Sequence, residues 1–228
     1  MNRFSLYILL VLIYLGISKS YTPHEVGTNF LEDEKLFSSF FPGAPVTVIL
    51  QDSFEKGFLI KAYYQRYQVF DVFTGTENIV IRTSKKFWKK NLENQGMSLF
   101  SRRESDFSET LTPTIPGHIF IGDPSYGQWE LGVNKQKFWT FHRPYRHFPQ
   151  ALYWGNFRPT EAIYKDIQNF AAQDLVYKGP HQEFGTKGLI TQDLLRDYHG
   201  KLNKIQIKFW EHLKSFWNIP TVEGSSFL

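Results

Sequence analysis

The chain has 228 residues, and 26 lysines and arginines against 22 aspartates and glutamates give a formal net charge of +4. This near balance argues against a dedicated nucleic-acid-binding protein, so we expect no nucleic-acid partner. The complete absence of cysteine excludes a thiol nucleophile, a thiolate zinc site, an iron–sulfur cluster and a redox pair.

Residues 1–20 have the pattern of a secretory signal peptide. Arg3 gives a basic start, residues 4–17 are apolar, and Ser18 and Ser20 are the small residues expected before a cleavage site. We expect cleavage after Ser20 and export to the periplasm or the extracellular space. The alternative is an uncleaved anchor, although about fourteen apolar residues are fewer than the roughly 20 that span a membrane. No transmembrane segment is expected after the signal peptide.

The lack of cysteine also bears on the compartment. Secreted domains of this size often carry disulfides in oxidising compartments. A cysteine-free chain with a leader therefore favours a bacterial cell-envelope protein over a eukaryotic secreted one.

Residues 21–112 are predicted to form a β-rich N-terminal lobe. Residues 21–41 are acidic at first and then aromatic, which indicates a short helix that ends at Pro42-Gly43. Short runs rich in β-branched and aromatic residues then predict antiparallel strands in a meander or small barrel. These runs are residues 46–50, 57–64, 67–73 and 78–83, separated by expected turns at Asp52-Ser53, Gln65-Arg66 and residues 74–77.

A basic cluster and a polar passage end this lobe. Four lysines (Lys85, Lys86, Lys89 and Lys90) surround Phe87 and Trp88. They fit a solvated surface helix or loop, or a patch that attracts an anionic envelope polymer or lipid headgroups. Residues 101–114 are rich in serine, threonine and acidic residues, which indicates a surface loop or a linker between two lobes.

Residues 113–228 are predicted to form an α+β C-terminal lobe, unless the two lobes form one continuous domain. Strands at 117–122, 128–131 and 137–142, with a turn at Asn134, would make a second short sheet. A helix should begin after Thr160 and extend to about Leu175, and a last helix should run from Thr191 to just before Pro220. The whole chain is therefore predicted to be α+β, with two C-terminal helices.

Residues 138–159 are the densest stretch of the chain, with eight aromatic residues, three arginines and two histidines. Prolines at 144, 149 and 159 prevent it from being one helix, because each removes a backbone donor and clashes with the preceding turn. It is predicted to be an ordered connection, and such connections on a rigid scaffold are where binding sites concentrate.

Five residues are candidates for catalysis. A carboxylate at a strand end can act as a general base, and a histidine can move a proton beside an arginine that holds a carboxylate or phosphate. The alternative to a catalytic role is a structural one, in which the aspartate forms a turn and the arginines hold a loop in place. No metal-site, nucleotide-binding or serine-hydrolase motif occurs, so neither a metal nor a cofactor is predicted. The candidates are Asp123, His142, His147, His181 and Glu183.

A second set of residues is predicted to bind a ligand. At 18% of the chain, the aromatic residues either build the core or form an exposed platform on which a sugar or peptide stacks. Exposure alone separates these two alternatives. The candidates are Tyr126, Trp129, Trp139, Arg143, Arg146, Trp154, Asn156 and Arg158.

Three hypotheses of function follow. The first is an exported, non-catalytic envelope protein that binds a cell-wall polymer or another surface component, such as an envelope protein, through residues 117–158. The second is a hydrolase or transferase that acts on an envelope polymer, and it requires an acid and a histidine to converge in one cleft. The third is a structural subunit of an exported assembly, which requires a broad apolar patch.

Overall fold

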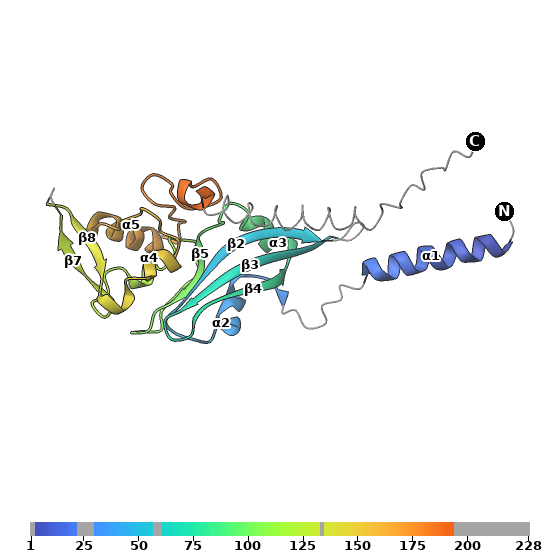
Figure 1. The fold of residues 1–228 in the computed structure, drawn as a ribbon, viewed down its shortest axis with the longest axis horizontal. Helices are drawn as coiled ribbons and strands as arrows, with labels where there is room; N and C mark the ends of the chain where they lie inside the picture. Colours follow the sequence, from blue (N-terminus) through green and yellow to red (C-terminus); the bar gives the residue numbers. More distant parts are fainter. Residues whose placement is uncertain (1–2, 22–29, 57–60, 133–134, 194–228) are drawn as a thin grey trace, which may run out of the picture. The chain divides into compact units, whose positions relative to one another are not determined.

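The computed structural model describes residues 3–21, 30–56, 61–132 and 135–193. Residues 1–191 and 192–228 form two compact units, and the second lies almost entirely outside the described ranges. The first unit contains a six-stranded sheet, a two-stranded sheet and several helices, with α4 and α5 late in the chain (Figure 1). This arrangement confirms the predicted α+β class.

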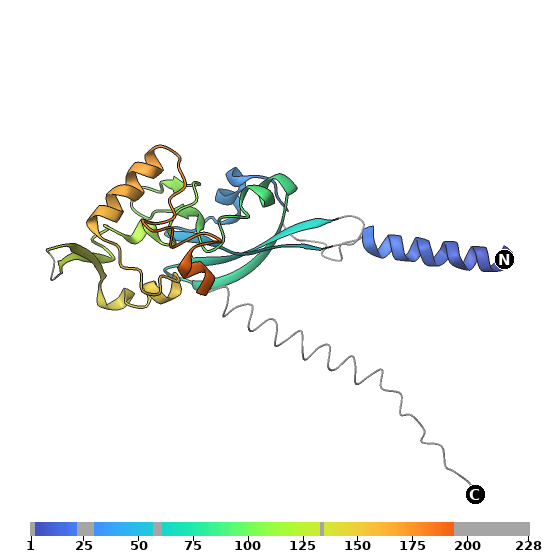
Figure 2. The same ribbon diagram turned by 90° about the horizontal axis from the view of Figure 1, so that it is seen from above.

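The large sheet has the strand order β1-β4-β3-β2-β5-β6. Its centre is the predicted meander, because β2, β3 and β4 pair antiparallel in sequence order, while β1 pairs parallel with β4 and makes the sheet mixed. Figure 2 shows the long strands curling along their length. The strands are β1 (Phe30–Leu31), β2 (Val46–Lys56), β3 (Ala62–Asp71), β4 (Gly75–Thr83), β5 (Ser98–Arg102) and β6 (Glu109–Thr110).

The second sheet is the antiparallel pair of β7 (Gly127–Leu131) and β8 (Lys137–Phe141), in which Trp129 lies opposite Trp139. Both strands were predicted, and the predicted turn residue Asn134 lies outside the described residues. The paired strands bring two tryptophans side by side, with ring centroids 5.1 Å apart. The predicted second short sheet is confirmed.

The helices of the first unit are mostly short. None of those described is both long and apolar enough to cross a membrane. They are α1 (Arg3–Tyr21), α2 (Phe37–Phe40), α3 (Lys85–Lys90), α4 (Phe148–Ala151) and α5 (Glu161–Ala172), with 3₁₀ turns η1 (Glu34–Leu36), η2 (His118–Phe120) and η3 (Arg143–Tyr145).

Several helix boundaries match the sequence signals. The short helix α2 ends before Pro42, and α5 begins after Thr160, whose hydroxyl accepts a hydrogen bond from the backbone N–H of Ile163 at 3.3 Å. This is the N-cap interaction that the sequence predicted. The last predicted helix is seen only at residues 189–193, because the remainder lies outside the described part of the chain.

Two hydrophobic clusters pack against opposite faces of the large sheet, because successive side chains of a strand point to opposite sides. On β3, Tyr67 belongs to the cluster that contains Phe37 and Phe100, whereas Phe70 belongs to the cluster that contains Phe120. The cluster that contains Phe70 and Phe120 also includes residues of the stretch 138–159 and of the following helix. It therefore connects the candidate site to the sheet.

A buried ring of three hydroxyl groups joins β2 to β5. Thr47 Oγ1 lies 2.8 Å from the hydroxyls of both Ser98 and Ser101, which are themselves 2.8 Å apart. Ser98 also donates to the carbonyl oxygen of Phe100 at 3.0 Å. Because these hydroxyls satisfy one another, three polar side chains can occupy the sheet interior.

Two of the predicted strands were wrong in their limits. We expected turns at Asp52-Ser53 and Gln65-Arg66, but β2 runs through the first pair and β3 through the second, and the two pairs lie opposite each other in the sheet. Gln65 is fully buried, where its amide donates to Ser53 Oγ at 3.3 Å and accepts from the Tyr67 hydroxyl at 2.6 Å. Because these hydrogen bonds satisfy its side chain inside the sheet, Gln65 can continue the strand instead of forming a turn.

Two other predictions failed between the sheets. Residues 101–114 are not entirely a surface loop, because the buried strand β5 extends to Arg102 and β6 follows at Glu109–Thr110. Residues 117–122 are not a strand but contain η2, since Gly117 and Gly122 adopt φ values of 69° and 81°, outside the extended region. The spacing of apolar and polar residues normally distinguishes a strand from a helix, but a short, fully buried apolar run lacks such a spacing.

Candidate functional site

The stretch of residues 138–159 is an ordered connection, as predicted, and not a single helix. It starts in β8, passes through η3 and α4, and returns to the beginning of α5. The backbone N–H of Trp139 donates to the carbonyl oxygen of Pro159 at 2.9 Å, and Phe138 forms a β-bridge with Thr160. The stretch therefore folds back so that its two ends lie side by side.

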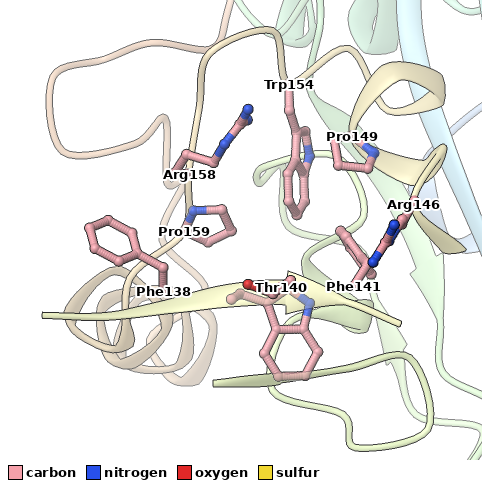
Figure 3. Close-up of a pocket in the computed structure, with 9 residues that line it drawn as sticks. Phe138, Thr140, Phe141, Arg146, Pro149, Trp154, Arg158 and Pro159 are labelled. Atoms are coloured by element: carbon pink, nitrogen blue, oxygen red, sulfur yellow. The ribbon is translucent and has the colours of Figure 1, made fainter. Parts of the chain in front are cut away.

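An open cleft of about 420 Å³ lies within this fold-back, and residues from this one stretch line it. Figure 3 shows the cleft with Trp154 at its centre and arginines on either side of that ring. Because every lining residue comes from one stretch, the shape of the cleft is set locally. The lining residues are Phe138, Trp139, Thr140, Phe141, Arg146, Pro149, Trp154, Arg158 and Pro159.

The tryptophans of the cleft are core residues that form its floor. Trp139 and Trp154 are only 5% and 1% exposed, and the indole N–H of Trp154 donates to the carbonyl oxygen of Pro116 at 2.8 Å. Trp154 also packs against Phe141 and Phe157. For these two rings, burial favours the core interpretation over an exposed platform. The half-buried ring that remains accessible in the cleft belongs to Phe138.

Four predicted ligand-binding residues thus line one cleft, namely Trp139, Arg146, Trp154 and Arg158. Of these, only the two arginines are exposed. No aspartate or glutamate is among the lining residues. The cleft therefore combines an apolar floor with an uncompensated positive charge.

The other four predicted ligand-binding residues lie outside the lining. Tyr126 is buried and its hydroxyl donates to Glu104 Oε2 at 2.7 Å, so burial and this hydrogen bond raise the pKa of Tyr126 well above its ordinary value. Trp129 packs on Trp139 and Tyr164. Arg143 and Asn156 are exposed, and in sequence each lies between two lining residues without lining the cleft itself.

The first catalytic candidates lie near each other without a mutual hydrogen bond. The carboxylate of Asp123 accepts a hydrogen bond from the backbone N–H of Ser125 at 2.9 Å, as an ordinary turn-forming aspartate does. His142 Nε2 lies 3.1 Å from the carbonyl oxygen of Pro124, to which it donates. Both side chains therefore stabilise the turn that precedes β7.

The remaining catalytic candidates lie apart from that pair. His147 is exposed and its ring meets the Phe148 ring edge-on. The carboxylate of Glu183 accepts from the backbone N–H of His181 at 3.0 Å, not from its ring. Within the described ranges no acid of the predicted set bonds to a histidine ring, and no cluster of three histidine or acidic residues could hold a metal. A catalytic role for these residues stays a prediction.

Sequence reasoning missed five lining residues, namely Phe138, Thr140, Phe141, Pro149 and Pro159. One signal could have found two of them. Phe138 and Thr140 alternate along a strand that was predicted, so their side chains share one face of β8. The prolines could not be placed, because their contribution depends on how the connection folds back.

The class of molecule is thus an α+β protein with a locally built aromatic and arginine-bearing cleft. Comparisons with protein-family models, with curated proteins and with solved structures find no match to this chain. Function is therefore inferred from the chemistry of the cleft, since a fold alone does not determine function.

Proposed function

We propose that the protein is an exported, non-catalytic component of the bacterial cell envelope that binds a cell-wall or surface component through the cleft of residues 138–159. The observation that supports this proposal most strongly is the cleft itself. Its volume of about 420 Å³ lies within the range of small-molecule sites, roughly 300–1,000 Å³. Such a volume accommodates one or two sugar rings of a polymer.

The composition of the cleft favours binding over hydrolysis. General acid–base catalysis needs a titratable group within hydrogen-bond reach of the reacting atoms. Neither an acid nor a histidine lines this cleft, and Asp123 and Glu183 each accept a hydrogen bond from the backbone of their own turn. The lining residues offer apolar contact and positive charge, which suit recognition.

The amino-terminal sequence supports export. The helix α1 exposes a continuous set of apolar side chains from residue 4 to residue 15, and it carries no acidic residue in its first turn. A basic start followed by a short apolar segment is the composition of a secretory leader. The cysteine-free composition fits a bacterial envelope.

The proposal is tested by co-sedimentation of the mature chain with purified cell-wall fragments. We expect the wild-type protein to sediment with the fragments and Phe138→Ala to reduce the bound fraction several-fold, because Phe138 is the half-buried ring of the cleft. Phe73→Ala is the matched control, since Phe73 is 70% exposed in the turn after β3 and lies outside the cleft lining.

Release of soluble fragments is measured in the same samples. The binding proposal expects none, whereas the hydrolase hypothesis expects fragments that disappear in Asp123→Asn or Glu183→Gln. Equal sedimentation of the Phe138→Ala and Phe73→Ala proteins would show that the cleft does not bind the wall.

A further inference from the structure

The two arginines of the cleft are placed by different elements. Arg146 follows η3 and precedes α4, whereas Arg158 lies directly before the proline at which the chain meets β8. Figure 3 shows them on opposite sides of the Trp154 ring. A ligand lying over the apolar floor would therefore have a guanidinium group on either side of it.

Arg158 is held by its own turn. Its Nη1 donates to the carbonyl oxygens of Phe157 at 2.9 Å and Gly155 at 3.3 Å. Its Nε and Nη2 atoms have no partner in the part of the chain that the structure describes. A guanidinium group fixed through one nitrogen keeps its remaining donors in a defined orientation, which lowers the entropy lost on binding.

Arg146 carries a second free charge. Its side chain is exposed and makes neither a hydrogen bond nor an ion pair with another described residue. The acidic residue nearest to the cleft in sequence is engaged elsewhere, since Glu161 pairs with Lys137 at 3.4 Å and Lys165 at 3.2 Å. The cleft is therefore positive on both sides with no internal counter-charge.

The edge of β8 supplies a backbone donor. Successive residues of a strand direct their N–H groups to alternate sides. The N–H of Trp139 points away from β7 and donates to the carbonyl oxygen of Pro159. The N–H of His142 points the other way and donates to the carbonyl oxygen of Tyr126, the residue before β7. The N–H of Phe141 therefore also points away from β7, and Phe141 is one of the residues that line the cleft.

From these donors we propose that the cleft selects an anionic glycan, whose carboxylate or phosphate group lies between Arg146 and Arg158 while a sugar ring contacts Phe138 and Pro159. This inference rests on the proposed function and names the chemistry of its ligand. Guanidinium groups bind both anions through paired, charge-assisted hydrogen bonds. The apolar floor contacts the C–H face of the sugar ring.

The test is calorimetric titration of the mature chain with three probes of similar length. They are an oligogalacturonate, which carries carboxylates, an oligomer of glycerol phosphate, and a neutral gluco-oligosaccharide. We expect one or both anionic probes to bind at least roughly tenfold more tightly than the neutral one, and added salt to reduce this difference. The anionic probe that binds more tightly identifies the source of the charge.

Charge-removing variants assign the effect to the cleft. Arg146→Gln and Arg158→Gln should each weaken binding of the anionic probe roughly tenfold and leave the neutral probe unchanged. Arg82→Gln is the matched control, since it removes the same charge from β4, outside the cleft lining. Circular dichroism and the thermal midpoint establish that each variant is folded.

Two results would overturn the inference. One is equal affinity for the neutral and anionic probes, and the other is an anion preference that both arginine variants retain. If Phe138→Ala still reduces sedimentation with cell walls several-fold in either case, the proposed function stands and only the anionic ligand is wrong. If the wild-type chain binds neither walls nor probes, both proposals fail.

Discussion

His118 is a histidine that the fold holds in its uncharged form. It lies in η2, is 6% exposed, and its Nδ1 is a buried atom without a hydrogen-bond partner in the described ranges. Burial, assisted by the positive charge of Arg103, lowers the pKa of His118 from 6.5 to about 4. Protonation of this ring therefore opposes folding.

This environment predicts an acid-sensitive contribution to stability. Between pH 6.5 and pH 4 the unfolded chain binds a proton at His118 that the folded chain does not, so the free energy of unfolding falls as the pH falls. The contribution is fully present above pH 6.5, and up to about 3 kcal/mol of it is lost by pH 4. Urea unfolding of the wild-type chain at several pH values measures the loss.

The variant His118→Gln isolates the effect of this one ring. This substitution should lower the free energy of unfolding at neutral pH. It should also reduce the fall of that free energy between pH 6.5 and pH 4, because glutamine does not titrate. His147→Gln, which changes an exposed histidine, should keep the wild-type profile. Parallel profiles for wild type and His118→Gln would refute the assignment.

At the scale of elements, the β7–β8 hairpin depends on close approach at Gly127. A Cβ atom at this position would lie 2.4 Å from the carbonyl oxygen of Thr140 and 2.7 Å from Cζ2 of Trp139. The carbonyl oxygen belongs to the paired strand and cannot move without displacing the strand. Glycine is therefore required for the two strands and the Trp139 ring to pack together.

We predict that Gly127→Ala destabilises the protein by about 1–3 kcal/mol, the usual range for overpacking. Gly155→Ala is a useful comparison, because a Cβ there meets nothing within 4 Å and only the positive φ of 54° is unfavourable. That backbone cost is about 1–2 kcal/mol. Denaturant midpoints compare the two variants, and an unchanged midpoint for Gly127→Ala would show that the hairpin tolerates the added methyl group.

The elements that the sequence predicted well were those with a local signal. The strands β7 and β8 and the start of α5 each have turn or capping residues at their ends. The failures occurred where tertiary contacts satisfy polar groups. Gln65 inside β3 and the serines of β5 look like turn or loop residues until their buried partners are known.

The candidate site was predicted in part for the same reason. Residue composition located the stretch 138–159, and four of the eight predicted ligand-binding residues line its cleft. Sequence could not distinguish buried rings from exposed ones, because exposure of Trp139 and Trp154 depends on contacts with Pro116, Trp129 and Phe157. It also could not show that Asp123 and Glu183 bond to backbone.

At the scale of the whole molecule, the proposed export predicts where the mature chain would begin. Signal peptidases require small residues at the positions before cleavage. We expect the exported protein to begin at Tyr21, Ser20→Ala to be processed normally, and Ser20→Phe to block processing. Edman sequencing or intact-mass measurement of the protein recovered from cell fractions gives the answer. An intact amino terminus in the membrane fraction would instead establish the anchor alternative.

The hydroxyl ring between β2 and β5 has one further consequence, which follows from counting protons. Its three hydroxyls carry three hydrogen atoms, yet Thr47, Ser98 and Ser101 make three mutual contacts and Ser98 also reaches the Phe100 carbonyl. One of the four contacts therefore lacks a hydrogen atom, so the three hydroxyls cannot all be satisfied independently of one another. A slip of β5 by one residue would move Ser98 and Ser101 out of register with Thr47 on β2, so this group of three hydroxyls marks the correct alignment of β5 in the sheet.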